Sequence, residues 1–475
     1  MENLENQPAQ TTETESLDAK WYSRFEEIGS FQAYEYFNGD SNIRNTQKES
    51  FLNREIENPD LDYPLLDVDR INTIESSLMD LKQDILDHEP NEIVRNVYRW
   101  KINEKVAELR MMKSSHNGDM RRFERYSKYI YGKPSDEVFQ YTIYNLNNKI
   151  LQALKSDNPD IQAVAETLLR VISELDIETT NPDISTPSSD TVEIARAQTK
   201  KEFNHILNIP LAEGKYDSTS IRNAFEIALT QLQAEGWVAV VSDNVPSIST
   251  NQEQRNITIP ESRTLPSKTR LQALLLHEAG THVARRVNGE NTKLKLLSLG
   301  LDRYEQGEEG VATMREQVLK DSVNDFSGLE GHLAISLAMG LDGKRRDFRE
   351  TYEILEKYFY FKAILAKKSP EEASISAKND AYKRCIRTFR GTNCKTRGVC
   401  FTKDMIYREG SIGVWDVIRN NPDEMMRFSV GKYDPSNERH IYVLEQLGIS
   451  DEDLITLDSP ALDTNPSYNP TNSPN

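Results

Sequence analysis

Residues 271–290 of the chain read LQALLLHEAGTHVARRVNGE, and two histidines and a glutamate, His277, Glu278 and His282, lie at the centre of this stretch. Its apolar positions recur at the spacing of a helix. Ser267 precedes them and can cap the first turn. The stretch therefore predicts a helix that carries two imidazoles and a carboxylate.

Two histidines with an intervening glutamate on one helix are typical of zinc metallopeptidases, in which neutral imidazoles hold the metal and the glutamate acts on the metal-bound water. The usual pattern places the histidines four residues apart, whereas His282 follows His277 by five. On an ideal helix, positions i and i+4 are about 40° apart and positions i and i+5 about 140°. The spacing predicts a local fault such as a π-bulge, which Gly280 can absorb. The alternative is an ordinary helix on which Glu278 and His282 form a surface pair.

A hydrolytic zinc site keeps three protein ligands and one open position, so a third ligand must come from another segment. Residues 301–320 carry apolar residues at helical spacing, and Glu305, Glu308 and Glu309 stand just before that helix or in its first turn. Any of these carboxylates can be the ligand. They can also be present only because acidic groups stabilise the start of a helix.

These residues resemble a known family. The sequence HEAGTH, from His277 to His282, and the sequence EEGVA, beginning at Glu308, look like the two motifs of the tyrosine carboxypeptidase family, which includes the microtubule-associated tyrosine carboxypeptidases and bacterial relatives. That family builds a zinc site from a His-Glu-x-x-x-His helix and a later Glu-Gly-Leu-Ala-like motif. The resemblance implies that His277, His282 and Glu309 bind Zn²⁺, and that Glu278 is the catalytic base.

The resemblance extends beyond the motifs to roughly residues 200–450 and includes the segments 331–347 and 387–410. Val311 stands where the family often has Leu, which is a conservative departure. Periodicity alone predicts a largely helical protein with a small sheet. The resemblance implies an α+β, mainly helical fold, with a zincin-like metallopeptidase domain that has a small sheet and an active-site helix and is preceded by a helical region.

Composition along the chain predicts its organisation. We expect a disordered acidic N-terminus over 1–20, a helical N-terminal region over 21–178, a linker over 179–190, the metallopeptidase domain over 191–450, and a disordered tail over 451–475.

Two short segments before the histidine helix are rich in β-branched and aromatic residues, 237–241 and 256–259, and both are expected to be strands. In zinc peptidases an edge strand can bind an extended substrate through main-chain hydrogen bonds. The segment 256–259 is the candidate for this role, and the alternative is that it is a buried strand.

A carboxypeptidase needs a cation that binds the terminal carboxylate of its substrate. Residues 383–403 contain seven basic residues and no acidic one. The hypothesis is that Arg390 or Lys403 anchors the substrate, and that Tyr407 hydrogen-bonds the oxyanion or packs against a C-terminal aromatic residue. The alternative is that this basic segment lies on the surface or pairs with acidic residues elsewhere.

The overall composition excludes some classes of partner. A net charge of −18 argues against nucleic acid, because such binding is dominated by phosphate neutralisation. There is no apolar run of about 18 residues, so we expect no membrane span. Three cysteines, an odd number, favour reduced thiols and a cytoplasmic location, although Cys394 and Cys400 are close enough for a disulfide or a metal pair.

The resemblance therefore implies a zinc metallocarboxypeptidase that hydrolyses the C-terminal peptide bond of a protein or peptide, with a preference for a C-terminal Tyr or Phe. The alternatives are a zinc endopeptidase with the same site and a non-catalytic helical scaffold. A further histidine, His332, is interpreted as a helix-start residue without a chemical role. An acidic substrate such as the tubulin tail fits poorly with the charge of this chain, so the substrate stays open.

Overall fold

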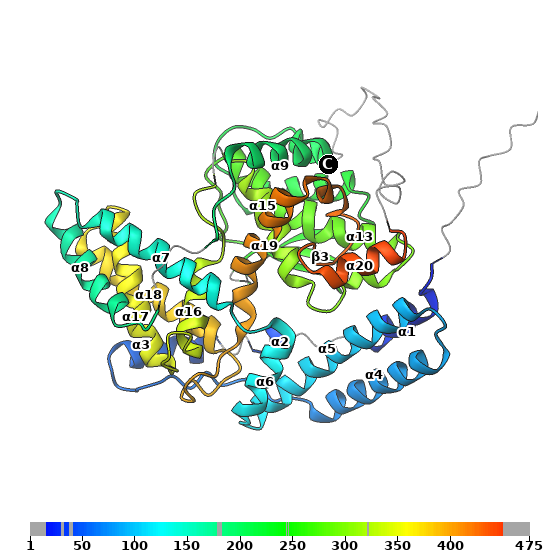
Figure 1. The fold of residues 1–475 in the computed structure, drawn as a ribbon, viewed down its shortest axis with the longest axis horizontal. Helices are drawn as coiled ribbons and strands as arrows, with labels where there is room; N and C mark the ends of the chain where they lie inside the picture. Colours follow the sequence, from blue (N-terminus) through cyan, green and yellow to red (C-terminus); the bar gives the residue numbers. More distant parts are fainter. Residues whose placement is uncertain are drawn as a thin grey trace, which may run out of the picture.

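The protein is described here from a computed structural model, drawn in Figure 1. The described residues are 16–29, 33–37, 41–177, 183–243, 245, 247–320 and 323–449. The tail expected over 451–475 and most of the expected N-terminal disordered segment lie outside the described residues, as does part of the linker.

Helices dominate the described chain, and a small sheet interrupts them once (Figure 1). The helices before the sheet are α1 (Ala19–Ile28), α2 (Ala33–Tyr36), α3 (Ser41–Leu52), α4 (Val68–His88), α5 (Glu92–His116), α6 (Met120–Tyr131), α7 (Asp136–Ala153), α8 (Pro159–Ser173), α9 (Ser189–Glu202), α10 (Asn204–Leu207) and α11 (Ser218–Gln231). The strands are β1 (Val238–Ser242), β2 (Ser249–Asn251) and β3 (Asn256–Pro260). The elements after the sheet are α12 (Lys268–His277), the π-helix η1 (Glu278–Val283), α13 (Ala284–Glu290), α14 (Leu296–Leu299), α15 (Glu305–Gln317), α16 (Leu329–Met339), α17 (Phe348–Leu365), α18 (Pro370–Phe389), the 3₁₀ turn η2 (Thr402–Met405), α19 (Ile406–Asn420), the 3₁₀ turn η3 (Pro422–Arg427) and α20 (Glu438–Gln446). The expectation of a mainly helical α+β protein with a small sheet is confirmed.

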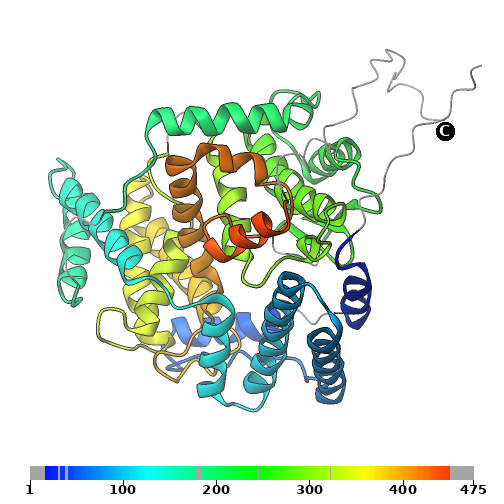
Figure 2. The ribbon, with the colours of Figure 1, turned by 45° about the vertical axis from the view of Figure 1, so that its right-hand side comes forward.

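The helices before the linker share their hydrophobic cores with the helices after it. Trp21, Tyr98 and Phe123 pack in one core with Leu297 and Phe401. A second core joins α7 and α8 to α17 and α18, which lie side by side in Figures 1 and 2. Because buried apolar area is shared in this way, the N-terminal helices belong to the same packed body as the helices that follow the linker.

The packed body begins earlier than the sequence predicts. Asp18 is buried, and its carboxylate accepts hydrogen bonds from the backbone N–H groups of Lys295 (2.8 Å) and Leu296 (2.9 Å) and from the hydroxyl of Tyr98 (2.8 Å). A buried carboxylate with three donors fixes the chain around it. The expectation that the whole of 1–20 is disordered is therefore wrong for the last part of that range.

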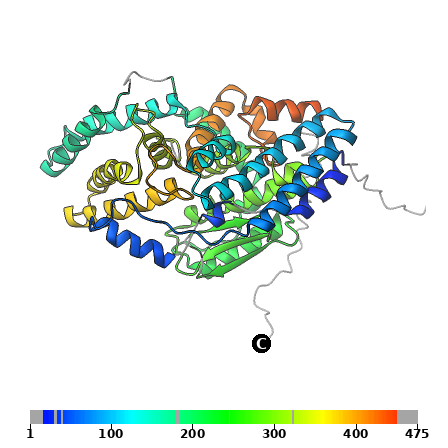
Figure 3. The same ribbon diagram turned by 90° about the horizontal axis from the view of Figure 1, so that it is seen from below.

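The sheet has the order β1-β3-β2, with β1 parallel and β2 antiparallel to β3. Figure 3 shows it at one edge of the body. Ile257 and Ile259 point inward from β3 and are fully buried in a core formed with α11 and α12. Because β3 is paired on both sides, it cannot accept a substrate strand, and the expectation that 256–259 takes this role is wrong. The edge strand that contacts η1 is β2, a three-residue strand too short to stand out in the sequence.

No helix in the described part of the chain is long and apolar enough to cross a membrane. Cys385, Cys394 and Cys400 are buried, free thiols. The alternative of a disulfide between Cys394 and Cys400 is therefore not realised in the fold.

Candidate metal centre

The two histidines meet because the helix that carries them changes type between them. Helix α12 begins after Ser267, whose hydroxyl accepts the N–H of Arg270, and ends at His277. The next six residues form the π-helix η1. The backbone N–H of Ala284 donates a hydrogen bond to the carbonyl of Ala279, five residues earlier in the chain. The wider turn adds the residue that the spacing requires, and the rings of His277 and His282 lie with their centroids 5.0 Å apart. The predicted local fault is confirmed.

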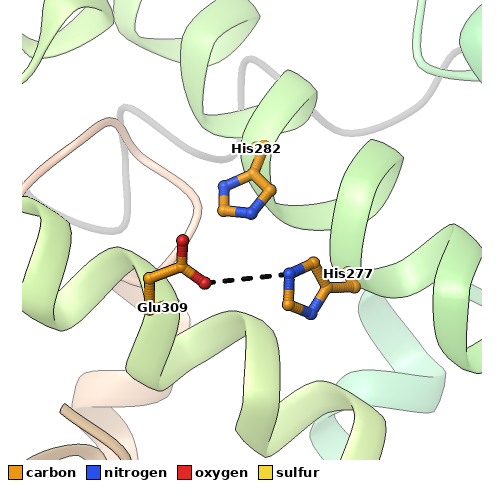
Figure 4. A group of neighbouring side chains, drawn as sticks. All are labelled: His277, His282 and Glu309. Carbon is orange, nitrogen blue, oxygen red and sulfur yellow. Dashed lines mark ion pairs between the residues drawn. The ribbon is translucent and has the colours of Figure 1, made fainter. Parts of the chain in front are cut away.

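The third member of the group comes from α15. One ligand atom from each of His277, His282 and Glu309 lies within 4.8 Å of the others, and the His277 Nε2 to Glu309 Oε2 distance is 3.8 Å (Figure 4). Glu309 Oε2 is buried and has no hydrogen-bond partner among the residues that the structure describes. Ligand atoms around a tetrahedral zinc lie about 3.3 Å apart, so the three side chains, whose ligand atoms lie within 4.8 Å of one another, would have to move closer together to hold such an ion. An orphaned buried carboxylate oxygen that faces two imidazoles fits a metal cation.

The other carboxylates of the acidic group have different partners. Glu308 Oε1 lies 2.9 Å from His282 Nδ1, and Glu305 pairs with Lys403. Of the three carboxylates that the sequence leaves open as ligands, the structure brings only Glu309 to the metal-facing side. Glu305 lies one helical turn before Glu309 on the same face of α15.

A carboxylate oxygen lies close to the Nδ1 atom of each histidine. Besides the Glu308 contact to His282, Glu316 Oε1 lies 2.6 Å from His277 Nδ1. At His282 this contact is a hydrogen bond, and an Nδ1–H that donates to a carboxylate leaves Nε2 free as a metal ligand and fixes the ring orientation. At His277 the Glu316 carboxylate lies at ion-pair distance from Nδ1. Burial lowers the pKa of His277, but Glu316 and the neighbouring carboxylates more than offset this and raise it to about 10. A metal ligand must be the neutral imidazole, so metal binding at His277 competes with its proton.

Glu308 is charged although it is buried. Burial raises its pKa, and this is outweighed by Lys432, whose Nζ lies 2.7 Å from Oε1, and by Arg285, whose Nη1 lies 2.9 Å from Oε2, so the pKa is well below its usual range. Arg285 also donates to the carbonyls of Gly431 (2.6 Å) and Tyr433 (2.6 Å), which ties the C-terminal segment to the site. Sequence reasoning missed Glu316, Arg285 and Lys432. Of these three residues, only Arg285 could have been suspected from the sequence, because it follows His282 by three residues and therefore lies near the same helix face.

Glu278 lies beside the three metal-facing residues and is not one of them. It is 8% exposed, and its Oε2 accepts a hydrogen bond of 2.7 Å from Thr250 Oγ1 in β2. Thr250 pairs with the buried Ile257 and so points to the inner face of the sheet, toward η1. Strand β2 therefore contributes the side chain that orients Glu278.

The residues expected to bind substrate lie at different places. Lys403 in η2 pairs with Glu305; burial lowers its pKa, and the carboxylates of Glu305 and Glu309 more than offset this. Arg390 is 3% exposed and places Nη2 3.5 Å from Asp404 Oδ1. Of the two cations, Lys403 lies next to the metal-facing group, because it pairs with Glu305 and is influenced by Glu309.

Two more sequence expectations concern residues near α16. Tyr407 is partly buried and packs against Gly328. His332 is fully buried, with Nε2 3.1 Å from Glu409 Oε1 and Nδ1 3.3 Å from Ser336 Oγ. His332 is not a member of the metal-facing group, the one such cluster found among the described residues.

The chain is thus a mainly helical α+β protein with a candidate metal centre made of two imidazoles and a carboxylate from two packed helices. The sequence model of one family, microtubule-associated tyrosine carboxypeptidase, matches residues 180–455, which is more than half of the chain. The chain belongs to this family and is a carboxypeptidase by that membership. No curated protein and no solved structure matches the chain.

Proposed function

We propose that the chain is a zinc-dependent metallocarboxypeptidase that removes the last residue of a protein or peptide, with a preference for a C-terminal Tyr or Phe. The observation that carries the proposal is the convergence of His277, His282 and Glu309, with a carboxylate on each histidine Nδ1 and an unpaired oxygen on Glu309. Family membership supports the reaction type. The buried free thiols agree with a cytoplasmic location.

In this proposal His277, His282 and Glu309 hold the zinc. Bound zinc supplies a water of lowered pKa and polarises the carbonyl of the scissile bond. Glu278 accepts the proton of the attacking water and then gives it to the leaving amine. Its hydrogen bond with Thr250 holds one carboxylate oxygen, which leaves the other for the proton.

Removal of a single C-terminal residue requires a cation near the scissile bond. Consecutive Cα atoms are 3.8 Å apart, so the terminal carboxylate lies only a few ångströms from the carbonyl that is attacked. Lys403 pairs with Glu305, which precedes Glu309 by one helical turn of about 5.4 Å. This separation from the proposed zinc ligand is close to the separation of the terminal carboxylate from the scissile carbonyl. We therefore propose Lys403 as the anchor of the substrate carboxylate.

The role of Arg390 is proposed to be indirect. Arg384 and Arg387 share the carboxylate of Asp404 with it, at 3.0 Å and 2.6 Å, and this cluster supports η2 and hence Lys403. Tyr407 remains a proposed contact for the oxyanion or for an aromatic side chain of the substrate.

The test is to incubate the purified zinc-loaded chain with peptides that end in Tyr, Phe or Ala, each as the free acid and as the C-terminal amide. Mass spectrometry should show loss of one residue from the free acids, fastest for Tyr and Phe, and no loss from the amides. Internal cuts would favour the endopeptidase. A Glu278→Gln variant that is as active in cells as the wild type would favour the scaffold.

A further inference from the structure

Arg315 joins the ligand helix α15 to the π-turn between the two histidines. It follows Glu309 by six residues, and its side chain is 1% exposed. Its Nη1 donates to the carbonyl of Gly280 (2.8 Å) and to the hydroxyl of Thr281 (3.1 Å), both inside η1. The two helices that supply the candidate ligands are thus linked by one guanidinium group.

The π-turn needs such a donor. A π-turn replaces the regular i to i−4 bonds of the helix, and the carbonyls it displaces have to find other donors. Gly280 is buried, so water cannot donate a hydrogen bond to its carbonyl. Arg315 Nη1 donates one instead. The hydroxyl of Thr281 accepts from Arg315 and donates to the carbonyl of Leu276 (2.9 Å), which makes a second connection across the same turn.

The other side of the guanidinium is held from outside the turn. Arg315 Nη2 lies 3.2 Å from both carboxylate oxygens of Glu202 and 2.7 Å from Ser429 Oγ. The ring of Phe203 lies below the group, with its centroid 4.5 Å from Cζ. These contacts hold the guanidinium group where its Nη1 reaches the carbonyl of Gly280 in the wide turn.

We propose that Arg315 is the positioning residue that keeps residues 278–283 in the π-turn, in which His277 and His282 point to the same place. In a regular helix the two rings would be about 140° apart and could not share an ion. Loss of Arg315 therefore weakens metal binding without removing a ligand. The proposal rests on the proposed zinc site.

The experiment measures zinc affinity of the full chain by competition with a chromogenic chelator, for the wild type and for Arg315→Met. We expect binding ten- to a hundredfold weaker in the variant, as for other residues behind metal ligands. The matched control is Arg408→Met, because Arg408 is equally buried and donates to Thr142 Oγ1 (2.8 Å) and to the carbonyl of Phe326 (3.0 Å), away from the metal-facing group. Its zinc affinity should stay within about twofold of the wild type, although its thermal stability falls.

Equal affinity of Arg315→Met and the wild type overturns the inference, and so does an equal loss in Arg408→Met, since that loss would come from general destabilisation. A wild type that binds no zinc overturns the proposed function as well. If Arg315→Met does not fold, Thr281→Val and Thr281→Ser decide instead. The hydroxyl is retained only in the second, so we expect weaker zinc binding in Thr281→Val alone, and equal affinities would overturn the inference.

Discussion

Thr250 Oγ1 donates a hydrogen bond of 2.7 Å to Glu278 Oε2, and this bond joins the edge strand of the sheet to the proposed catalytic base. The bond is charge-assisted and partly buried, and such bonds contribute about 1.5–3 kcal/mol. Without it the carboxylate can rotate away from the position in which it accepts a proton.

The first prediction follows from this bond. Thr250→Val keeps the shape of the side chain and removes the donor, so kcat should fall about ten- to a hundredfold while KM and zinc content stay unchanged. Thr250→Ser retains a hydroxyl and should keep most of the activity. Steady-state kinetics on one free-acid peptide measure both variants, and equal rates for Val and Ser would remove Thr250 from this role.

The second prediction concerns the substrate carboxylate. Lys403→Met removes the proposed anchor, so kcat/KM for peptides with a free C-terminus should fall about ten- to a hundredfold, chiefly through KM. Arg390→Ala is the comparison, because Arg390 faces Asp404. If Arg390→Ala raises KM more than Lys403→Met does, then Arg390 is the anchor.

The sequence predicted the elements of the fold well where the signals are local. The caps, the helical periodicity and the extra residue between His277 and His282 are properties of neighbouring residues, and they predicted both the helix and its π-turn. The packing of the N-terminal helices was not predictable, because it depends on contacts such as that of Asp18 with Leu296, far apart in the chain.

The candidate site divides in the same way. The metal-facing residues belong to two recognisable motifs. The residues that support them, such as Glu316, Lys432 and Arg315, stand alone in the sequence and become meaningful only when the chain folds back on itself. An acidic residue next to Glu309 could be interpreted as helix-start charge, whereas Glu308 in fact holds His282. Strand β2 was missed since three residues show no periodicity.

The third prediction concerns the charges behind His282. Lys432 and Glu308 are 2% and 4% exposed, so Lys432→Met leaves the carboxylate with Arg285 as its remaining cation. Breaking a buried pair by removing one partner costs about 3–5 kcal/mol. Urea unfolding should show a loss of at most this size for Lys432→Met, because Arg285 still pairs with the Glu308 carboxylate.

The matching double variant, Glu308→Gln with Lys432→Met, removes both charges of this pair, but it leaves the fully buried Arg285 without its carboxylate partner. It should therefore be no more stable than Lys432→Met. Its zinc affinity should also be about ten- to a hundredfold weaker, because Gln is a poorer partner for His282 than a carboxylate. A double variant that binds zinc as tightly as the wild type would show that Glu308 does not support the metal site.

The last prediction concerns the metal itself. The purified chain should contain about one zinc per molecule by elemental analysis, and His282→Ala should contain almost none, because two ligands cannot hold the ion against buffer. His88→Ala is the control: His88 is exposed on α4 and far from the metal-facing group in sequence and contacts, so its zinc content should equal that of the wild type. A chelator should abolish peptide hydrolysis by the wild type, and added zinc should restore it. Zinc that persists in His282→Ala would mean that the ion is bound elsewhere, and the grouping of His277, His282 and Glu309 would then be a structural cluster of two imidazoles and a carboxylate.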